Sequence, residues 1–219
     1  MSLVELITTD DGSHSLFRPD LNETYHSRHG ALQESQHVFI NNGLHFWLDK
    51  TGRNSLVIFE VGFGTGLNAW LTYREARDKK LKVKYVSVET FPLQRDVWTQ
   101  LNYAVDDPLF NGLHEAPWNV AISIDDCFEL YKINGKLEDV RIGEPIDLVY
   151  YDAFAPVKQP ELWQLPVLEN VCRPLNAFGV FVTYCAKGQL KRDLRTLGLE
   201  VETLQGPPGK KEMVRAVRT

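Results

Sequence analysis

The chain has 219 residues, of which 43% are hydrophobic and 24% charged, and its formal net charge is −5. This length suits one well-buried core and is short for two ordinary domains. The acidic balance argues against a protein that coats nucleic acid unspecifically. The sequence shows no apolar run of membrane-spanning length and no signal-peptide pattern, and its three cysteines form no CxxC pair. We therefore expect a cytoplasmic protein without membrane contacts.

The first 50 residues are predicted to form a hairpin and a helix, which pack over a site in a main domain of residues 51–219. Leu3–Thr8 and His14–Arg18 flank an Asp-Asp-Gly turn sequence, which is typical of a hairpin. Apolar residues then recur at helical spacing over Ala31–Ile40, and Asn41-Asn42-Gly43 predicts the end of that helix.

From Leu56 onward, short apolar runs alternate with amphipathic segments of helical length, which predicts a parallel sheet with helices on both faces. The predicted strands are Leu56–Val61, Val83–Glu89, Val120–Ile124, Asp147–Asp152 and Phe178–Tyr184. The predicted helices are Leu67–Asp78, Leu93–Tyr103, Cys127–Tyr131, Glu161–Arg173 and Lys187–Leu197. A Gly-Pro-Pro-Gly turn joins Leu199–Leu204 to Glu212–Arg218, so these segments are predicted to pair antiparallel. The fold class expected is α/β, a Rossmann-like class I methyltransferase domain with a mostly parallel seven-stranded sheet and one antiparallel strand.

A glycine-rich turn follows the first strongly apolar strand and precedes a helix. It contains Glu60, Gly62, Gly64 and Gly66, and its glycines allow the backbone to approach a ligand closely. The GxGxG spacing differs from the GxGxxG of dinucleotide binders, and Glu60 would repel a diphosphate. Glu60 could instead accept hydrogen bonds from the amino group of a methionine moiety. We therefore predict S-adenosylmethionine as the cofactor, although such a turn can also serve packing alone.

Two further acidic positions follow predicted strands. Glu89 ends the second strand, roughly 20 residues beyond the glycines, where a carboxylate can bind both ribose hydroxyls. Asp125 and Asp126 follow the third predicted strand, and one of them is predicted to accept the exocyclic amine of adenine. An Asp here could equally be a helix N-cap, and the spacing does not decide which Asp takes which part.

The fourth predicted strand ends at Asp152, which is followed by Phe154 and Pro156. Ligands of open α/β sheets lie beyond the carboxyl ends of the strands. Asp152 is therefore the predicted catalytic residue, which orients a nucleophilic amine or takes its proton. Phe154 could stack on a planar base, and Pro156 would fix the turn. A buried acid that caps the next helix is the alternative for Asp152.

Taken together, these residues resemble the MnmC-like tRNA methyltransferase family. The matching segments include Tyr25–Ser35, Glu60–Asn68, Asp152–Pro156, Pro160–Trp163, Thr183-Tyr184 and Gly209–Met213. The resemblance implies methylation of 5-aminomethyl-2-thiouridine to 5-methylaminomethyl-2-thiouridine at the tRNA wobble position. It also implies that Tyr25, Glu34 and Tyr184 face the substrate. Two-domain relatives add a flavin-dependent oxidoreductase; this sequence has no second glycine-rich fingerprint, so we expect a stand-alone methyltransferase without FAD.

The charge distribution suggests where a tRNA anticodon loop could bind. Residues 187–219 carry a net charge of +4, whereas the rest of the chain carries −9. Lys210 and Lys211 are the predicted phosphate contacts of this segment, and Arg28 is a further one near the cofactor. The spacing of His26, His29 and His37 matches no common zinc pattern, so no metal is expected.

The residues alone leave three alternative functions open. An aminopropyltransferase of the spermidine synthase kind shares the expected fold, the ribose acid and an Asp after the fourth strand. A methyltransferase acting on another amine would share the whole site. A non-catalytic Rossmann-like binding module would lack turnover, and the pairing of Asp152 with Phe154 weighs against it.

Overall fold

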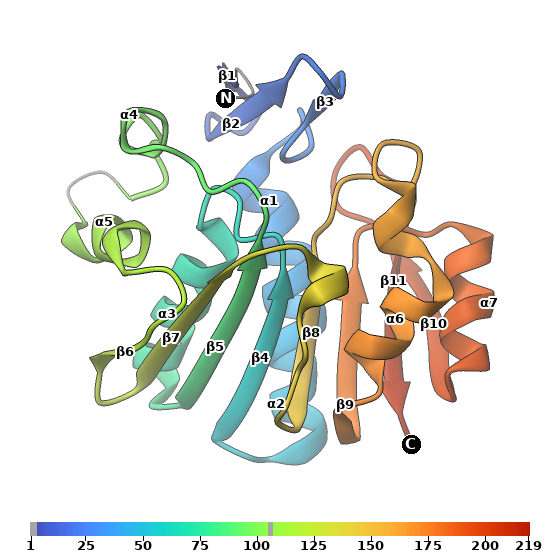
Figure 1. Ribbon diagram of the computed structural model, residues 1–219. Coiled ribbons are helices and arrows are strands. Elements are labelled where there is room, and N and C mark those ends of the chain that lie inside the picture. The colour runs from blue at the N-terminus through green and yellow to red at the C-terminus, as the bar shows by residue number, and fades with distance from the viewer. Residues whose placement is uncertain (1–3, 105–106) are drawn as a thin grey trace.

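The computed structural model describes residues 4–104 and 107–219, so Leu3 of the first predicted strand lies outside the described residues. Within these ranges, eight strands form one central sheet in the order β10-β11-β9-β8-β4-β5-β7-β6 (Figure 1). The strands of this sheet are β4 (Ser55–Val61), β5 (Lys82–Glu89), β6 (Ala121–Asp125), β7 (Phe128–Asn134), β8 (Ile146–Tyr151), β9 (Leu175–Thr183), β10 (Leu199–Gln205) and β11 (Glu212–Arg218).

The middle of this sheet is parallel and its two sides are not. Strands β7, β5, β4, β8 and β9 run parallel, whereas β11 pairs antiparallel with β9 and β6 pairs antiparallel with β7. The Rossmann-like α/β class is therefore confirmed, and so is the antiparallel pairing of β10 with β11. The expected count of seven strands is wrong, because β7 was not predicted as a strand and brings the sheet to eight.

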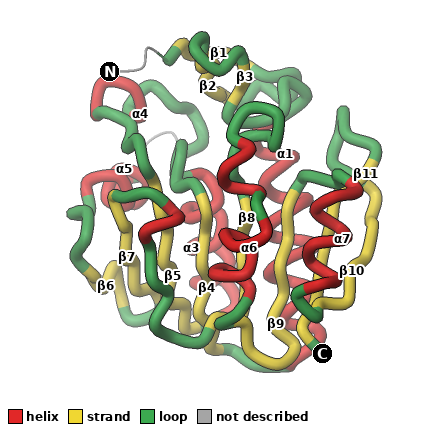
Figure 2. Tube along the Cα trace, turned by 45° about the vertical axis from the view of Figure 1, so that its right-hand side comes forward, coloured by secondary structure: helices red, strands yellow, loops and turns green. Residues whose placement is uncertain are grey.

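Helices cover both faces of the sheet (Figures 1 and 2). In Figure 1, α6 and α7 lie on the face turned toward the viewer, and α3 lies behind it. The helical segments after β4 are α3 (Leu67–Lys79), α4 (Arg95–Trp98), α5 (Pro108–Glu115), α6 (Leu165–Cys172), α7 (Gly188–Thr196) and the 3₁₀ turns η2 (Leu137–Asp139) and η3 (Pro160–Trp163). All six residues of β8 are buried, as expected for a strand covered on both sides.

A continuous helical run precedes β4 and covers part of the rear face. It consists of α1 (Ala31–Ser35), the π-helical segment η1 (Gln36–His45) and α2 (Phe46–Thr51). The predicted helix end at Asn41-Asn42-Gly43 is therefore wrong. A Cβ at Gly43 would lie 3.0 Å from the Val182 side chain, so this glycine lets the helix approach the sheet closely.

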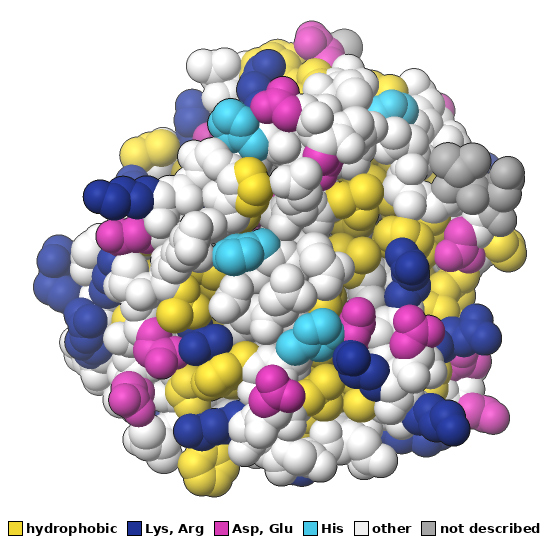
Figure 3. All heavy atoms as spheres, turned by 180° about the vertical axis from the view of Figure 1, so that it is seen from behind, with side chains coloured by type: hydrophobic (Ala, Val, Ile, Leu, Met, Phe, Trp, Pro, Cys, Tyr) yellow, Lys and Arg dark blue, Asp and Glu magenta, His cyan; other side chains and the backbone are white. Residues whose placement is uncertain are grey.

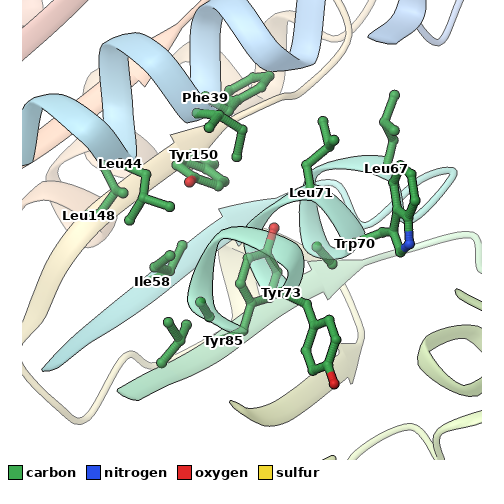
Figure 4. Packing of buried hydrophobic residues seen from close by; sticks show 14 of the residues in the cluster. Phe39, Leu44, Ile58, Leu67, Trp70, Leu71, Tyr73, Tyr85, Leu148 and Tyr150 are labelled. Atoms are coloured by element: carbon green, nitrogen blue, oxygen red, sulfur yellow. The ribbon is translucent and has the colours of Figure 1, made fainter. Parts of the chain in front are cut away.

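Aromatic and aliphatic side chains of this run form the rear core with the sheet (Figure 4). The ring of Phe39 lies 5.2 Å from that of Tyr150 in β8, and Leu44 lies near Leu148 of the same strand. The segment 31–51 therefore packs as a sheet-covering helix. Its first turn, which contains Glu34, lies nearest the carboxyl ends of the strands (Figure 1).

The predicted hairpin is present as part of a small separate sheet. It contains β1 (Glu5–Thr8), β2 (His14–Arg18) and the two-residue β3 (Glu23–Thr24), and it lies above the carboxyl ends of the central strands (Figure 1). In the described part of the chain, no helix is long and apolar enough to cross a bilayer.

Three helix predictions differ from the structure. Of the predicted helix Leu93–Tyr103, only the single turn α4 is helical. The predicted helix Cys127–Tyr131 is wrong, because these residues begin strand β7. Helix α5 was not predicted; Asp107 caps it by accepting a hydrogen bond from the Leu109 amide at 2.9 Å.

Candidate active site

A pocket of about 800 Å³ opens at the carboxyl ends of β4, β5 and β8, under the N-terminal sheet. Its walls come from segments far apart in the sequence: the glycine turn, the ends of β5 and β8, and the residues around Tyr25. The lining residues are Arg18, Tyr25, His26, Val61, Gly62, Phe63, Gly64, Thr65, Leu67, Asn68, Val88, Glu89, Thr90, Phe91, Leu137, Asp152, Ala153, Phe154, Gln159, Leu162 and Tyr184.

The glycine turn forms the floor of this pocket. Gly62, Gly64 and Gly66 have φ angles of +89°, +50° and +72°, a region that side chains rarely adopt. A Cβ at Gly62 would lie 2.9 Å from the carbonyl oxygen of Asp152, and one at Gly66 would lie 2.8 Å from Nε2 of His114. The turn therefore fits tightly between the end of β8 and helix α5.

Glu89 lines the pocket where β5 ends. One of its carboxylate oxygens accepts a hydrogen bond from the Gly64 amide at 3.0 Å, and the other accepts one from the Phe91 amide at 2.8 Å. Burial raises the pKa of Glu89, and these amide hydrogen bonds act against that effect. The predicted ribose acid is thus fixed beside the glycine turn.

Glu60 does not line the pocket, although it was predicted to contact the methionine amino group. Its side chain is buried beneath the turn and accepts a hydrogen bond from Ser87 Oγ at 2.7 Å. Burial raises its pKa to about 8, and the nearby Asp152 adds to this rise. A mostly neutral acid without access to the pocket does not fit the predicted contact, so the structure corrects that prediction.

The raised pKa of Glu60 predicts a pH dependence of stability. The native state binds this proton more tightly than the unfolded chain, so the stabilisation is full at low pH and is lost as pH rises toward about 8. We expect Glu60→Gln to remove this loss. Between about pH 5.5 and about pH 7.5, the free energy of unfolding of the wild type should fall by roughly 2 kcal/mol more than that of the variant. That difference is about 4–8 °C in thermal unfolding midpoint. Parallel midpoint curves for the two proteins would contradict the assignment.

Asp125 and Asp126 lie at the end of the sheet opposite the pocket, where they cannot contact a bound cofactor. They form the turn between antiparallel β6 and β7, which is at the amino end of β7. Asp125 accepts hydrogen bonds from Tyr73 Oη at 2.7 Å and from the Cys127 amide at 2.8 Å. The predicted adenine contact is therefore wrong. The carboxyl end of β7 is Asn134, and Leu137 just beyond it lines the pocket.

Asp152 lies in the pocket at the end of β8. Its Oδ2 accepts a hydrogen bond from Asn68 Nδ2 at 2.9 Å, which fixes the carboxylate. Burial raises the pKa of Asp152 to about 7; the negative charge of Glu34 raises it further, and the positive charge of Lys210 lowers it. Such a carboxylate exchanges a proton near neutral pH. Asn68, in the first turn of α3, was not predicted as a site residue.

Aromatic side chains flank Asp152. The rings of Tyr25 and Phe154 meet edge to face at 5.1 Å, and the guanidinium of Arg18 lies 5.9 Å from the Phe154 centroid. Tyr184 lines the pocket, and its hydroxyl donates a hydrogen bond to the Ala153 carbonyl at 2.8 Å. Pro156 lies outside the pocket lining. Arg18 was not predicted, because nothing in the sequence around it indicates a site.

The remaining predicted substrate residues separate into an inner and an outer pair. Glu34 is buried and forms an ion pair of 2.5 Å with Lys210, and neither residue is among those that line the pocket. Arg28 and Lys211 are exposed and do not line the pocket. Among the residues that the structure describes, no cluster of three or more His, Cys, Asp or Glu is arranged to hold a metal ion.

A parallel sheet with a glycine turn after β4, an acidic residue at the end of β5 and a pocket between them is the arrangement expected of a Rossmann-like methyltransferase that uses S-adenosylmethionine. In agreement with this class, residues 120–219 match a family model described as S-adenosyl-L-methionine-dependent methyltransferase. The chain is similar over most of its length to the methyltransferase part of the MnmC proteins, as the following comparisons show.

Two relatives are named tRNA 5-methylaminomethyl-2-thiouridine biosynthesis bifunctional protein MnmC. The protein from Cupriavidus necator is 31% identical over 91% of this chain, and the one from Idiomarina loihiensis is 30% identical over 88%. The match spans 32% and 35% of those proteins, so the chain spans about a third of their length. The crystal structure of MNMC2 from Aquifex aeolicus is 26% identical, with a TM-score of 0.83 over 99% of this chain and 70% of that one.

Proposed function

We propose that the protein transfers a methyl group from S-adenosylmethionine to the aminomethyl nitrogen of 5-aminomethyl-2-thiouridine at the wobble position of tRNA, in the cytoplasm. The observation that carries this proposal is Asp152, a half-buried carboxylate in the pocket that Asn68 orients and aromatic side chains flank. The names of the relatives favour methyl transfer over the aminopropyl transfer left open by the residues.

The pocket suits the cofactor in shape and in polarity. The glycine turn gives backbone access, and Glu89 offers carboxylate oxygens for the ribose hydroxyls. When bound, S-adenosylmethionine supplies a methyl group on positively charged sulfur; its carbon–sulfur bond breaks as the amine nitrogen bonds the methyl carbon. Gly62, Gly64, Gly66 and Glu89 are the residues we assign to its binding.

Asp152 prepares the nucleophile. An alkylamine with a pKa of roughly 10 enters mostly as the ammonium form, which has no free lone pair. Asp152 accepts one ammonium proton, and the buried surroundings lower the pKa of the amine, which assists that transfer. The methylated product is again an ammonium, and the proton on Asp152 returns to solvent. Phe154 offers a ring face for the uracil, and a wobble base can enter without opening a duplex.

Replacement of Glu89 tests the cofactor assignment. We expect Glu89→Ala to weaken S-adenosylmethionine binding by about 10- to 100-fold, because hydrogen bonds to a carboxylate contribute about 1.5–3 kcal/mol each. Calorimetry measures the affinity. Glu200→Ala, on the exposed side of β10, is the matched control and should bind like wild type. Unchanged affinity in a folded Glu89→Ala protein would remove Glu89 from the cofactor site.

The tRNA contact is expected at the rim of the pocket. Three of the C-terminal cations are in ion pairs: Lys191 with Glu212 at 2.9 Å, Arg215 with Glu202 at 2.7 Å, and Lys210 with Glu34. Both charge signs also alternate over the rear face (Figure 3). Arg28 and Lys211 are exposed. The segments that carry them lie side by side, since a Cβ at Gly209 would be 1.8 Å from the ring of His29.

We therefore expect few phosphates to be neutralised, and a slope of log affinity on log salt of roughly −2 to −4. Arg28→Ala combined with Lys211→Ala should weaken tRNA binding and flatten this slope, while cofactor affinity stays the same. Filter binding across a salt series measures both quantities. A slope unchanged from wild type would place the tRNA elsewhere on the surface.

The deciding assay incubates enzyme and S-adenosylmethionine with tRNA that carries 5-aminomethyl-2-thiouridine. Mass spectrometry of the nucleosides should detect 5-methylaminomethyl-2-thiouridine. The same tRNA with an unmodified wobble uridine serves as control and should stay unmethylated. If the methylated nucleoside is absent although calorimetry verifies cofactor binding, the substrate assignment is wrong. The assignments of the fold and of the cofactor would still stand.

A further inference from the structure

The ammonium group of Lys210 is held between the carboxylate of Glu34 and the ring of Tyr184. Its Nζ lies 2.5 Å from Oε1 of Glu34 and 3.6 Å from the centroid of the Tyr184 ring. A carboxylate on one side and an aromatic face on the other are the two groups that bind an ammonium most favourably. The arrangement is thus a complete cation site, filled by a side chain of the same protein.

Glu34 is built into this site. Its side chain is only 6% exposed, and its second oxygen accepts a hydrogen bond from the Ser27 amide at 2.6 Å. A buried carboxylate is costly unless a cation or hydrogen-bond donors compensate its charge. The Ser27 amide compensates one oxygen of Glu34, and a cation at the place where Lys210 lies compensates the other.

The site adjoins the reacting centre. The Tyr184 ring, which Lys210 covers, also lines the cofactor pocket, and its hydroxyl is fixed on the Ala153 carbonyl next to Asp152. The charges of Glu34 and Lys210 both act on Asp152. A cation in this site is consequently near the group that takes the proton of the substrate.

We propose that Glu34 and Tyr184 form the ammonium-binding subsite for the substrate, and that Lys210 fills this subsite until the substrate amine displaces it. The inference rests on the proposed function, because it takes the substrate to be a primary amine. A lysine ends in the same CH₂–NH₃⁺ group as an aminomethyl base, so one site accepts either. Lys210 lies in the turn between β10 and β11 and its side chain is 30% exposed, which gives it a path to solvent.

The test compares two nucleosides on enzyme saturated with S-adenosylhomocysteine: 5-aminomethyluridine and its neutral analogue 5-hydroxymethyluridine. Neither carries a phosphate, so phosphate contacts do not enter. Lys210→Met removes the competing ammonium, and we expect it to tighten 5-aminomethyluridine binding by about tenfold or more while 5-hydroxymethyluridine changes less than about twofold. Glu34→Gln should abolish the preference for the amine, and the double variant should resemble Glu34→Gln. Lys50→Met, an exposed lysine at the end of α2, is the matched control and should bind like wild type.

Weaker binding of 5-aminomethyluridine to Lys210→Met, equal effects on both nucleosides, or no binding of either to this variant would overturn the proposal. Thermal unfolding with bound S-adenosylhomocysteine verifies that each variant is folded. The nucleoside test and the tRNA methylation assay test different proposals. If Lys210→Met binds the amine more tightly but the enzyme does not methylate the tRNA, the ammonium subsite stands and the tRNA substrate is wrong. If the enzyme methylates the tRNA but Lys210→Met does not bind the amine more tightly, the tRNA substrate stands and the ammonium subsite is wrong.

Discussion

We expect Asp152→Asn to lower the rate of methyl transfer by about 10²-fold or more, while S-adenosylmethionine affinity changes little. The amide keeps the shape of the side chain and cannot accept the ammonium proton. Single-turnover kinetics with saturating cofactor measure the rate, and calorimetry measures the affinity. The hydrogen bond from Asn68 Nδ2 to Asp152 Oδ2 would persist through the amide oxygen, so the fold should be unaffected.

The pH profile separates a proton acceptor from a merely polar residue. Because the pKa of Asp152 is about 7, the wild-type rate should fall about tenfold per pH unit as pH decreases below about 7. The Asp152→Asn enzyme should lose the inflection near pH 7, and its rate should instead keep rising with pH in proportion to the free-amine fraction of the substrate. Tyr184 cannot replace the base, since burial raises its pKa well above the ordinary value. Turnover of Asp152→Asn near the wild-type rate would move the catalytic role to another residue.

The second large effect is expected from Gly62→Ala. The φ of +89° disfavours any side chain, and the added methyl would lie 2.9 Å from the Asp152 carbonyl oxygen. The methyl would therefore displace both the cofactor turn and the catalytic acid. We expect kcat/KM to fall by more than about 10²-fold and stability to fall by about 1–3 kcal/mol. Steady-state kinetics and chemical denaturation measure the two effects.

Gly198→Ala is the matched control for backbone strain. Gly198 has a φ of +81°, and a Cβ there would meet nothing within 4 Å. We expect this variant to lose stability and to keep its kcat/KM. Equal losses of activity in the two variants would show that strain alone, and not the contact with Asp152, explains the effect at Gly62.

The elements predicted best from the sequence are those whose own residues carry a clear hydrophobic pattern. Buried parallel strands such as β4 and β8 appear as continuous apolar runs, and the groups at their carboxyl ends follow from the register of a parallel sheet. Glu89 and Asp152 were therefore assigned to the pocket correctly from their place in the chain.

The region around β6 and β7 could not be predicted from its pattern. Strand β6 pairs antiparallel at an edge, which nothing in the residues of a single strand indicates. The carboxyl end of this strand was assigned to the cofactor side of the sheet, so Asp125 was assigned to adenine. In β7 the buried face carries Phe128, Leu130 and Lys132, and this buried lysine hides the alternation that would otherwise predict a strand.

The ion pair of Glu34 with Lys210 joins residues 176 positions apart, so the sequence could only suggest that each lies near the substrate. Gly43 was predicted to end the helix, because the sequence does not distinguish a glycine that ends a helix from one that lets the helix pack closely on a sheet. Such contacts depend on the finished tertiary structure.

The strand order has a consequence for how the protein is made. The last strand in the sequence, β11, lies between β9 and β10, and in the described sheet β10 has β11 as its neighbour. The helical run at residues 31–51 packs on β8, β9 and β11, all from the last third of the chain. During synthesis, α3 can cover part of this helical run early, but the part that packs on β8, β9 and β11 stays uncovered until the residues of those strands have been made. That apolar surface is exposed to aggregation, and to chaperones, during this interval.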